Sequence, residues 1–76
     1  MPKIVRVRWT VLEKIFVRDR WQFDRQEDSH RSYVKLGTGR PVVIPACAAV
    51  PVSIIRNVMR MANMDRERYF ALLSEV

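Results

Sequence analysis

The sequence predicts a small α+β domain in which helices cover one face of an antiparallel three-stranded sheet. Apolar residues recur at helical spacing near the beginning and the end of the chain. The central segment instead shows strand-like alternation, interrupted by residues typical of turns. With 76 residues, the chain has room for a single domain spanning 1–76. A domain of this size suits a binding module or an enzyme with a shallow site.

The composition indicates a globular protein with surplus positive charge. Hydrophobic residues make up 49% of the chain, and 14 Lys and Arg against 8 Asp and Glu give a formal net charge of +6. This charge favours a polyanionic partner such as nucleic acid, although an acidic protein would use the same surface. One cysteine, Cys47, and one histidine, His30, cannot form an internal disulfide or a tetrahedral zinc site. We therefore expect a cytoplasmic protein without metal, small-molecule cofactor or membrane contact.

The first helix is predicted over residues 9–18. Leu12, Ile15 and Phe16 follow one another at helical spacing. The segment Thr10-Val11-Leu12-Glu13 has the spacing of a capping box, in which side chains and backbone amides satisfy one another at a helix start. At the start of the chain, residues 5–9 alternate apolar and basic side chains, which fits either a short strand or an extended arm.

Three strands are predicted after this helix. Trp21, Phe23 and Arg25 alternate with polar residues, which suits a strand with one buried face. A turn is predicted at 27–29 and a strand at 30–36. A glycine-containing turn is then predicted at 37–39 and a strand at 42–44. Pro41 and Pro45 bracket the last strand, as expected because proline suits strand ends.

Two helices complete the predicted order. A helical apolar pattern runs through positions 54, 55, 58, 59 and 62. Ser53 has the side chain of a helix start, and Asn63 has that of a helix end. Asp65 is predicted to cap a short last helix, whose apolar face consists of residues 69, 70, 72, 73 and 76.

His30 is the main candidate for chemistry, because an imidazole exchanges protons near neutral pH. Arg25, Arg31 and Lys35 are close to it in the sequence, which favours the approach of a phosphate. An imidazole can take the proton of a ribose 2′-hydroxyl, which then attacks the adjacent phosphorus while cations stabilise the added charge. The alternative is a strand histidine without a role.

Other side chains are weaker candidates. Arg56 and Arg60 share one helix face and suit phosphate or acidic side chains. Trp9, Trp21 and Tyr33 are aromatic residues able to stack bases, although Trp21 is expected in the core. The carboxylates around the first turn are expected to be merely solvated: Asp24, Glu27 and Asp28.

Several segments, taken in order, resemble the HicA family of toxins. Residues 24–34 resemble the family's RQ-x-GSH-x-x-Y stretch, and residues 42–45 resemble its strand ending in proline. Residues 55–62 and 65–70 resemble its second and C-terminal helices, and the opening Met1-Pro2-Lys3-Ile4 is similar to common family starts. The resemblance covers nearly the whole chain.

This resemblance implies an mRNA interferase, an endoribonuclease toxin of a type II toxin–antitoxin system, with a double-stranded-RNA-binding-domain-like α-β-β-β-α fold. It implies metal-independent cleavage of mRNA and inhibition by a HicB-type antitoxin. The family's essential histidine falls on His30, and its neighbouring serine falls on Ser29, which would orient the RNA or the imidazole. The basic residues expected to contact RNA are Arg25, Arg31, Lys35, Arg56 and Arg60. An antitoxin is expected to cover His30 and to pair its acidic groups with some of these arginines.

The sequence departs from the family at two positions. Asp28 stands where the family has glycine before Ser-His, and Cys47 stands where many members have a second histidine. If that second histidine assists as an acid, this chain would use another group, such as Tyr33, Lys35 or water.

Two other functions stay open from the sequence. One is an RNA-binding module without cleavage, and the other is a protein-interaction domain whose basic surface meets an acidic partner. Intact but retarded RNA would favour the first, and salt-sensitive binding to protein alone would favour the second.

Overall fold

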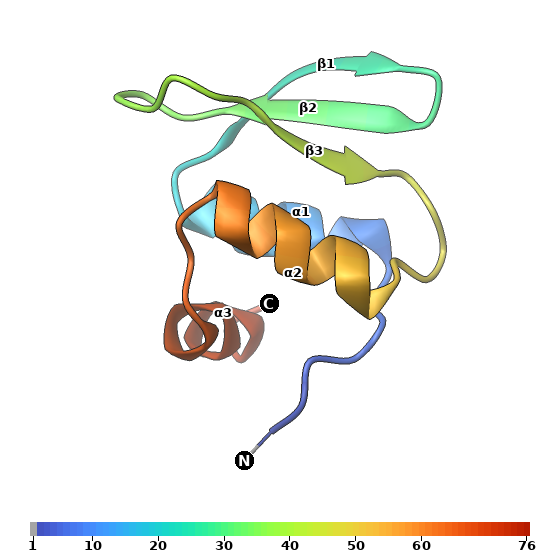
Figure 1. Ribbon diagram of the computed structural model, residues 1–76, viewed down its shortest axis with the longest axis vertical. Helices are drawn as coiled ribbons and strands as arrows, with labels where there is room; N and C mark the ends of the chain where they lie inside the picture. Colours follow the sequence, from blue (N-terminus) through green and yellow to red (C-terminus); the bar gives the residue numbers. More distant parts are fainter. Residues whose placement is uncertain (1) are drawn as a thin grey trace.

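Residues 2–76 form three helices and one sheet in the predicted order (Figure 1). The computed structural model describes residues 2–76, so Met1 of the opening segment lies outside it. The elements are α1 (Trp9–Arg18), β1 (Gln22–Glu27), β2 (His30–Val34), β3 (Val42–Pro45), α2 (Val52–Met61) and α3 (Arg66–Leu73). The strands pair antiparallel in the order β1-β2-β3, which confirms the α+β class. Within residues 2–76, no helix has the length and apolar character needed to cross a membrane.

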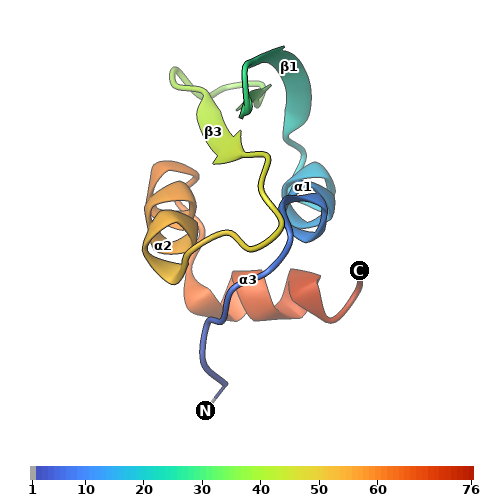
Figure 2. The ribbon, with the colours of Figure 1, turned by 90° about the vertical axis from the view of Figure 1, so that its right-hand side faces the viewer.

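All three helices lie on the same side of the sheet, but they form two layers. α1 and α2 lie side by side under the sheet, and α3 crosses beneath them, away from the strands (Figures 1 and 2). The molecule therefore has three layers, and the prediction that helices cover the sheet holds for α1 and α2 but not for α3. Tyr69 and Leu72 of α3 are buried in the common core, which explains why the helix packs there. The opposite face of the sheet is left open.

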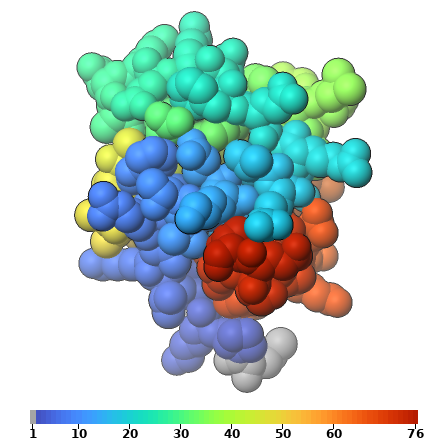
Figure 3. All heavy atoms as spheres, turned by 180° about the vertical axis from the view of Figure 1, so that it is seen from behind, coloured from blue at the N-terminus to red at the C-terminus, as the bar shows by residue number. Residues whose placement is uncertain are grey.

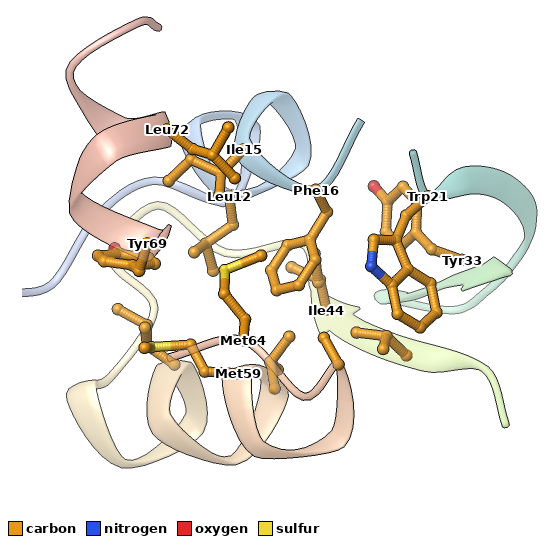
Figure 4. Packing of buried hydrophobic residues seen from close by; sticks show 14 of the residues in the cluster. Leu12, Ile15, Phe16, Trp21, Tyr33, Ile44, Met59, Met64, Tyr69 and Leu72 are labelled. Carbon is orange, nitrogen blue, oxygen red and sulfur yellow. The ribbon is translucent and has the colours of Figure 1, made fainter. Parts of the chain in front are cut away.

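One apolar core joins the layers (Figure 4). Phe16 lies in the middle of this core, with Trp21 and Tyr33 toward the sheet and Tyr69 toward α3. Met59 and Met64 line the α2 side, as expected for methionines that fill a core. The prediction that Trp21 is a core residue is confirmed, since only 2% of its surface is exposed.

The side-chain caps predicted for the first two helices are wrong, although α1 begins at the predicted residue. The residue before α1 is Arg8, and Glu13 turns its carboxylate to β2 instead of closing a capping box. α2 begins directly after Pro51, one residue before Ser53. At α1 the Trp9 N–H donates to the Cys47 carbonyl at 3.2 Å, so a residue distant in sequence takes the place of a local cap. At α2 the Pro51 carbonyl accepts from the Ile54 and Ile55 N–H groups, which places the start one residue earlier. The prediction for Asp65 is confirmed, since its Oδ1 accepts the Arg68 backbone N–H at 2.8 Å.

α1 and α2 end in the same way, with a non-glycine residue in the left-handed conformation. Arg20 has φ 73° after α1, and Asn63 has φ 55° after α2. In α1 the Trp21 N–H donates to the Phe16 carbonyl at 2.9 Å, and the Arg20 N–H donates to the Val17 carbonyl at 3.0 Å. This is the Schellman pattern, and the edge-to-face contact of Phe16 with Trp21 supplies its usual apolar contact. The helix end predicted at Asn63 is confirmed.

Replacing Arg20 with glycine is expected to stabilise the fold by about 0.5–1 kcal/mol. Glycine adopts positive φ without steric cost, whereas arginine is strained there. The matched control is Lys14→Gly inside α1, where glycine is expected to destabilise the fold by about 0.5–1 kcal/mol. Urea unfolding of both variants measures the difference. A lower free energy of unfolding for Arg20→Gly would contradict the expectation.

A β-bulge in β1 decides which side chains face the open side of the sheet. Phe23 pairs with Tyr33, but the register then shifts by one residue, so that Arg25 pairs with Ser32 and Glu27 pairs with His30. Strict alternation predicted Arg25 on the same face as Phe23, and this prediction is wrong because the extra residue turns Arg25 over. The prediction of a buried face is also wrong, because every β1 residue is exposed.

The segment before α1 and the connection between β2 and β3 agree broadly with the predictions from the sequence. Val7 and Val50 form an isolated antiparallel bridge, so the arm is extended and only briefly strand-like. The connection between β2 and β3 contains Gly37 at φ 88°, the left-handed conformation that favours glycine. β2 ends at Val34, two residues earlier than predicted.

Candidate functional site

His30 lies at the first position of β2, on the face of the sheet that no helix covers. Its partners across the strands are Glu27 on β1 and Pro45 on β3. The buried residues Tyr33, Val42 and Ile44 mark the helix-covered face. Because side chains alternate along a strand, His30 and Ser32 point to the opposite face, which solvent reaches. The open face therefore presents the imidazole directly to a large partner.

A shallow hollow of about 190 Å³ includes His30. Its lining comes from all three strands and the turn before β3: Arg25, Glu27, His30, Ser32, Pro41 and Val43. One cation, one carboxylate, one imidazole and one hydroxyl thus surround a small apolar area formed by Pro41 and Val43. The Arg25 Nε lies 3.6 Å from the Glu27 Oε1, and both side chains are largely exposed. This arrangement offers a proton-transfer group beside a guanidinium that can contact a phosphate oxygen.

Arg31, although next to His30 in sequence, is on the covered face. Its Nη2 donates to the Glu13 Oε2 at 2.8 Å, and its Nε donates to the Tyr33 hydroxyl at 3.0 Å. The guanidinium also lies over the rings of Trp9 and Phe23, with 4.6 Å and 4.3 Å from Cζ to the ring centroids. Arg31 thereby joins β2 to α1 and is not brought together with His30.

Lys35 is also separated from His30. Its Nζ lies 3.5 Å from the Asp19 Oδ2 and over the Trp21 ring, at the other end of the sheet. Asp19 also accepts from the Arg68 Nε at 3.1 Å, so this carboxylate joins α1, α3 and the end of β2. Of the basic residues placed around His30 by sequence distance, the structure keeps only Arg25 beside it.

The aromatic candidates for stacking lie on the covered side as well. Trp21 and Tyr33 are buried, and Trp9 is half-buried under Arg31. The Tyr33 hydroxyl donates to the Glu13 Oε2 at 2.5 Å and accepts from Arg31. Burial, reinforced by the hydrogen bond to Glu13, raises the pKa of Tyr33 to about 12. Tyr33 is therefore a structural residue.

The raised pKa of Tyr33 predicts a loss of stability at alkaline pH. A free tyrosine ionises at about pH 10 in the unfolded chain, whereas Tyr33 stays neutral until about pH 12 in the fold. The stability from this group is complete below pH 10 and falls by about 2–3 kcal/mol as the pH rises to 12. Burial also raises the pKa of Tyr69. Urea unfolding across this pH range should show the decrease in the free energy of unfolding. In Tyr33→Phe, only the part of this decrease that is due to Tyr69 should remain.

Arg56 and Arg60 lie far from His30. They line a separate hollow of about 680 Å³ between α2, α3 and the N-terminal arm, with the nearly buried side chains of Ile4, Met59 and Met64. This hollow is at the α2–α3 connection, whereas His30 adjoins the β1–β2 hairpin at the other end of the molecule (Figure 1). Viewed from behind, α1 separates the hairpin from α3 (Figure 3). One compact ligand cannot contact both places.

Of the two positions where the sequence departs from the HicA pattern, Asp28 lies in the hairpin turn and Cys47 lies after β3. Asp28 begins the two-residue turn and has φ 55°, a conformation that glycine adopts without strain. Ser29 is exposed in the same turn, and its carbonyl accepts the Ala46 N–H at 2.6 Å. Cys47 packs against the core and does not line the hollow around His30. Ser29 is thus the other predicted site residue that the structure keeps close to His30.

Sequence reasoning left three residues of the hollow out of the site: Ser32, Pro41 and Val43. It also treated Glu27 as a solvated turn residue, although Glu27 is the last residue of β1 and faces His30. Alternation along β2 was the available signal for Ser32, because it places Ser32 and not Arg31 on the face of His30.

His, Cys, Asp and Glu side chains within residues 2–76 form no group of three suited to hold a metal ion. Comparison of the chain with protein-family models, curated proteins and solved structures finds no match.

Proposed function

We propose that this protein is an endoribonuclease that cleaves mRNA with His30, and that it acts as the toxin of a type II toxin–antitoxin pair. The observation that carries the proposal is the exposed imidazole in a hollow with Arg25 and Ser32, on a sheet face that is free to receive a strand of RNA. The ordered resemblance to the HicA toxins supports it, and so does the helix–three-strand–helix order expected of their double-stranded-RNA-binding-domain-like fold.

The chemistry follows from the contents of the hollow. A ribose 2′-hydroxyl placed beside His30 loses its proton as its oxygen attacks the adjacent phosphorus. The P–O5′ bond then breaks while the leaving 5′-oxygen gains a proton, which leaves a 2′,3′-cyclic phosphate and a 5′-hydroxyl. One proton thus leaves O2′ for a base and one reaches O5′ from an acid, and His30 serves in one of these two transfers. The Arg25 guanidinium offers two donors to the phosphate oxygens as their negative charge increases. Pro41 and Val43 supply an apolar surface for a base or a ribose.

The partner in this proposal is a HicB-type antitoxin that covers the open sheet face. Because the face is shallow, an inhibitor prevents cleavage by occupying the hollow in place of RNA. Acidic side chains of such a partner would pair with Arg25, and charge complementarity would speed their association. A complex that inhibits cleavage while leaving His30 exposed would contradict this mode of inhibition.

The experiment is incubation of the purified protein with end-labelled RNA in the presence of EDTA. We expect fragments that carry 2′,3′-cyclic phosphate ends, since the 2′-hydroxyl is the nucleophile. The matched control is the same oligonucleotide with 2′-O-methyl riboses, which should stay intact because it has no nucleophile. RNA that is bound but never cleaved would replace the proposal with an RNA-binding module.

A protein-interaction domain is the second candidate, and one observation favours it. Three of the four charged residues between positions 24 and 28 are acidic, which opposes a phosphate backbone near His30. The arginines of the remote hollow instead lie beside an apolar floor, as in many protein interfaces. Binding to an acidic protein, with no retardation or cleavage of RNA, would support this candidate.

A further inference from the structure

Glu27 and His30 form the last residue pair of the β1–β2 hairpin before its turn. Directly opposed residues of an antiparallel pair have Cβ atoms about 4.5–5.5 Å apart and point to the same face of the sheet. Both side chains are exposed and both line the same hollow. The two-residue turn at 28–29 fixes this pairing, because loop length sets the register of a hairpin. The bulge between Phe23 and Arg25 then places Arg25 and Glu27 on the open face, opposite to Phe23. A carboxylate and an imidazole are thus held side by side at the site proposed for RNA.

The cleavage reaction requires two proton transfers, one from the attacking hydroxyl and one to the leaving oxygen. Tyr33 and Lys35, which the sequence suggested beside water as a second group, are engaged with Glu13 and Asp19 on the covered side. Within the hollow, the guanidinium of Arg25 does not give up a proton at ordinary pH. Among the described residues that line the hollow of His30, Glu27 carries the only carboxyl group.

We propose that Glu27 is a second catalytic residue, which takes the proton of the 2′-hydroxyl while His30 gives a proton to the leaving 5′-oxygen. This inference rests on the proposed ribonuclease function. In the step, the O2′–P bond forms and the P–O5′ bond breaks. The Glu27 carboxylate becomes a carboxylic acid, and the His30 imidazolium becomes a neutral imidazole, so protons and charge balance. Proton exchange with water restores both groups after the products leave.

The surroundings of the pair suit this division of roles. Among the described residues, no hydrogen bond or ion pair joins Glu27 to His30, so neither side chain is engaged by the other. The charged neighbours are Arg25, whose Nε lies 3.6 Å from the carboxylate, and Asp28 in the turn. β3 contributes no titratable group, since Val43 and Pro45 are its residues next to β2 on this face. Arg25 can bind the phosphate that the pair acts on.

The productive form has an ionised carboxylate and a protonated imidazole, which predicts a bell-shaped dependence of the cleavage rate on pH. The acidic limb belongs to Glu27 and the alkaline limb to His30. In Glu27→Gln, we expect the maximal rate to fall about 10²-fold and the acidic limb to disappear. Glu27→Asp should keep the acidic limb, because it retains a carboxylate at this position.

The matched control is Asp24→Asn, which removes the same charge from the same strand but does not line the hollow. Its rate should stay within about threefold of the unmodified protein, with both limbs present. Loss of the Arg25 ion pair alone would lower the rate without removing a limb, so the pH profile separates that effect from proton transfer. If RNA is cleaved and Glu27→Gln keeps its acidic limb, the role of Glu27 is overturned and the ribonuclease stands. If the unmodified protein cleaves no RNA, both proposals are overturned.

Discussion

Replacement of His30 by glutamine is expected to lower the rate of RNA cleavage by about 10²–10⁴-fold. Glutamine is similar in size and can form hydrogen bonds, but its amide does not exchange a proton near neutral pH. The loss should therefore appear in the chemical step. Initial rates of fragment formation from labelled RNA, measured with the unmodified protein in parallel, test this expectation. A rate within about threefold of the unmodified protein would show that His30 is not the catalytic group.

Two controls keep a loss of chemistry apart from a loss of structure or binding. The His30 side chain is exposed and makes no hydrogen bond with another described side chain. The free energy of unfolding, measured by thermal unfolding, should therefore change by no more than about 0.5 kcal/mol. Affinity for 2′-O-methyl RNA, which binds without being cleaved, should stay close to that of the unmodified protein. A variant that loses this affinity as well would make His30 a binding residue.

Periodicity was sufficient to predict most of the fold. The first helix has the predicted bounds, 9–18, because Leu12, Ile15 and Phe16 have one common core to face. The capping box failed for a physical reason. The Glu13 carboxylate accepts two hydrogen bonds from side chains of β2, and no side chain caps the start of α1. A carboxylate with a suitable local partner can thus be taken by a stronger partner that is distant in sequence.

The candidate site was harder to predict, because distance along a strand is not distance in space. Arg31 and Lys35 are close to His30 in sequence, yet alternation sends them to the covered face, where each pairs with an acidic residue. Alternation along β2 contains this information. The two-residue turn at 28–29 pairs Glu27 with His30, whereas the sequence predicted Glu27 inside the turn. The bulge that turns Arg25 to the open face has no comparable sequence signal, since it depends on how β1 meets β2.

Replacement of Leu12 by alanine is expected to have the largest effect on stability that we predict, a loss of about 2–5 kcal/mol. Leu12 is 0% exposed and lies on the side of α1 that faces the common core. A domain of this length has a total stability of roughly 0.05–0.15 kcal/mol per residue, so one cavity removes a large share of it. The matched control is Leu36→Ala, because Leu36 is 101% exposed in the turn after β2. Its free energy of unfolding should change by less than about 0.5 kcal/mol. Urea unfolding of the two variants compares the same chemical change inside and outside the core, and equal midpoints would show that α1 does not pack as described.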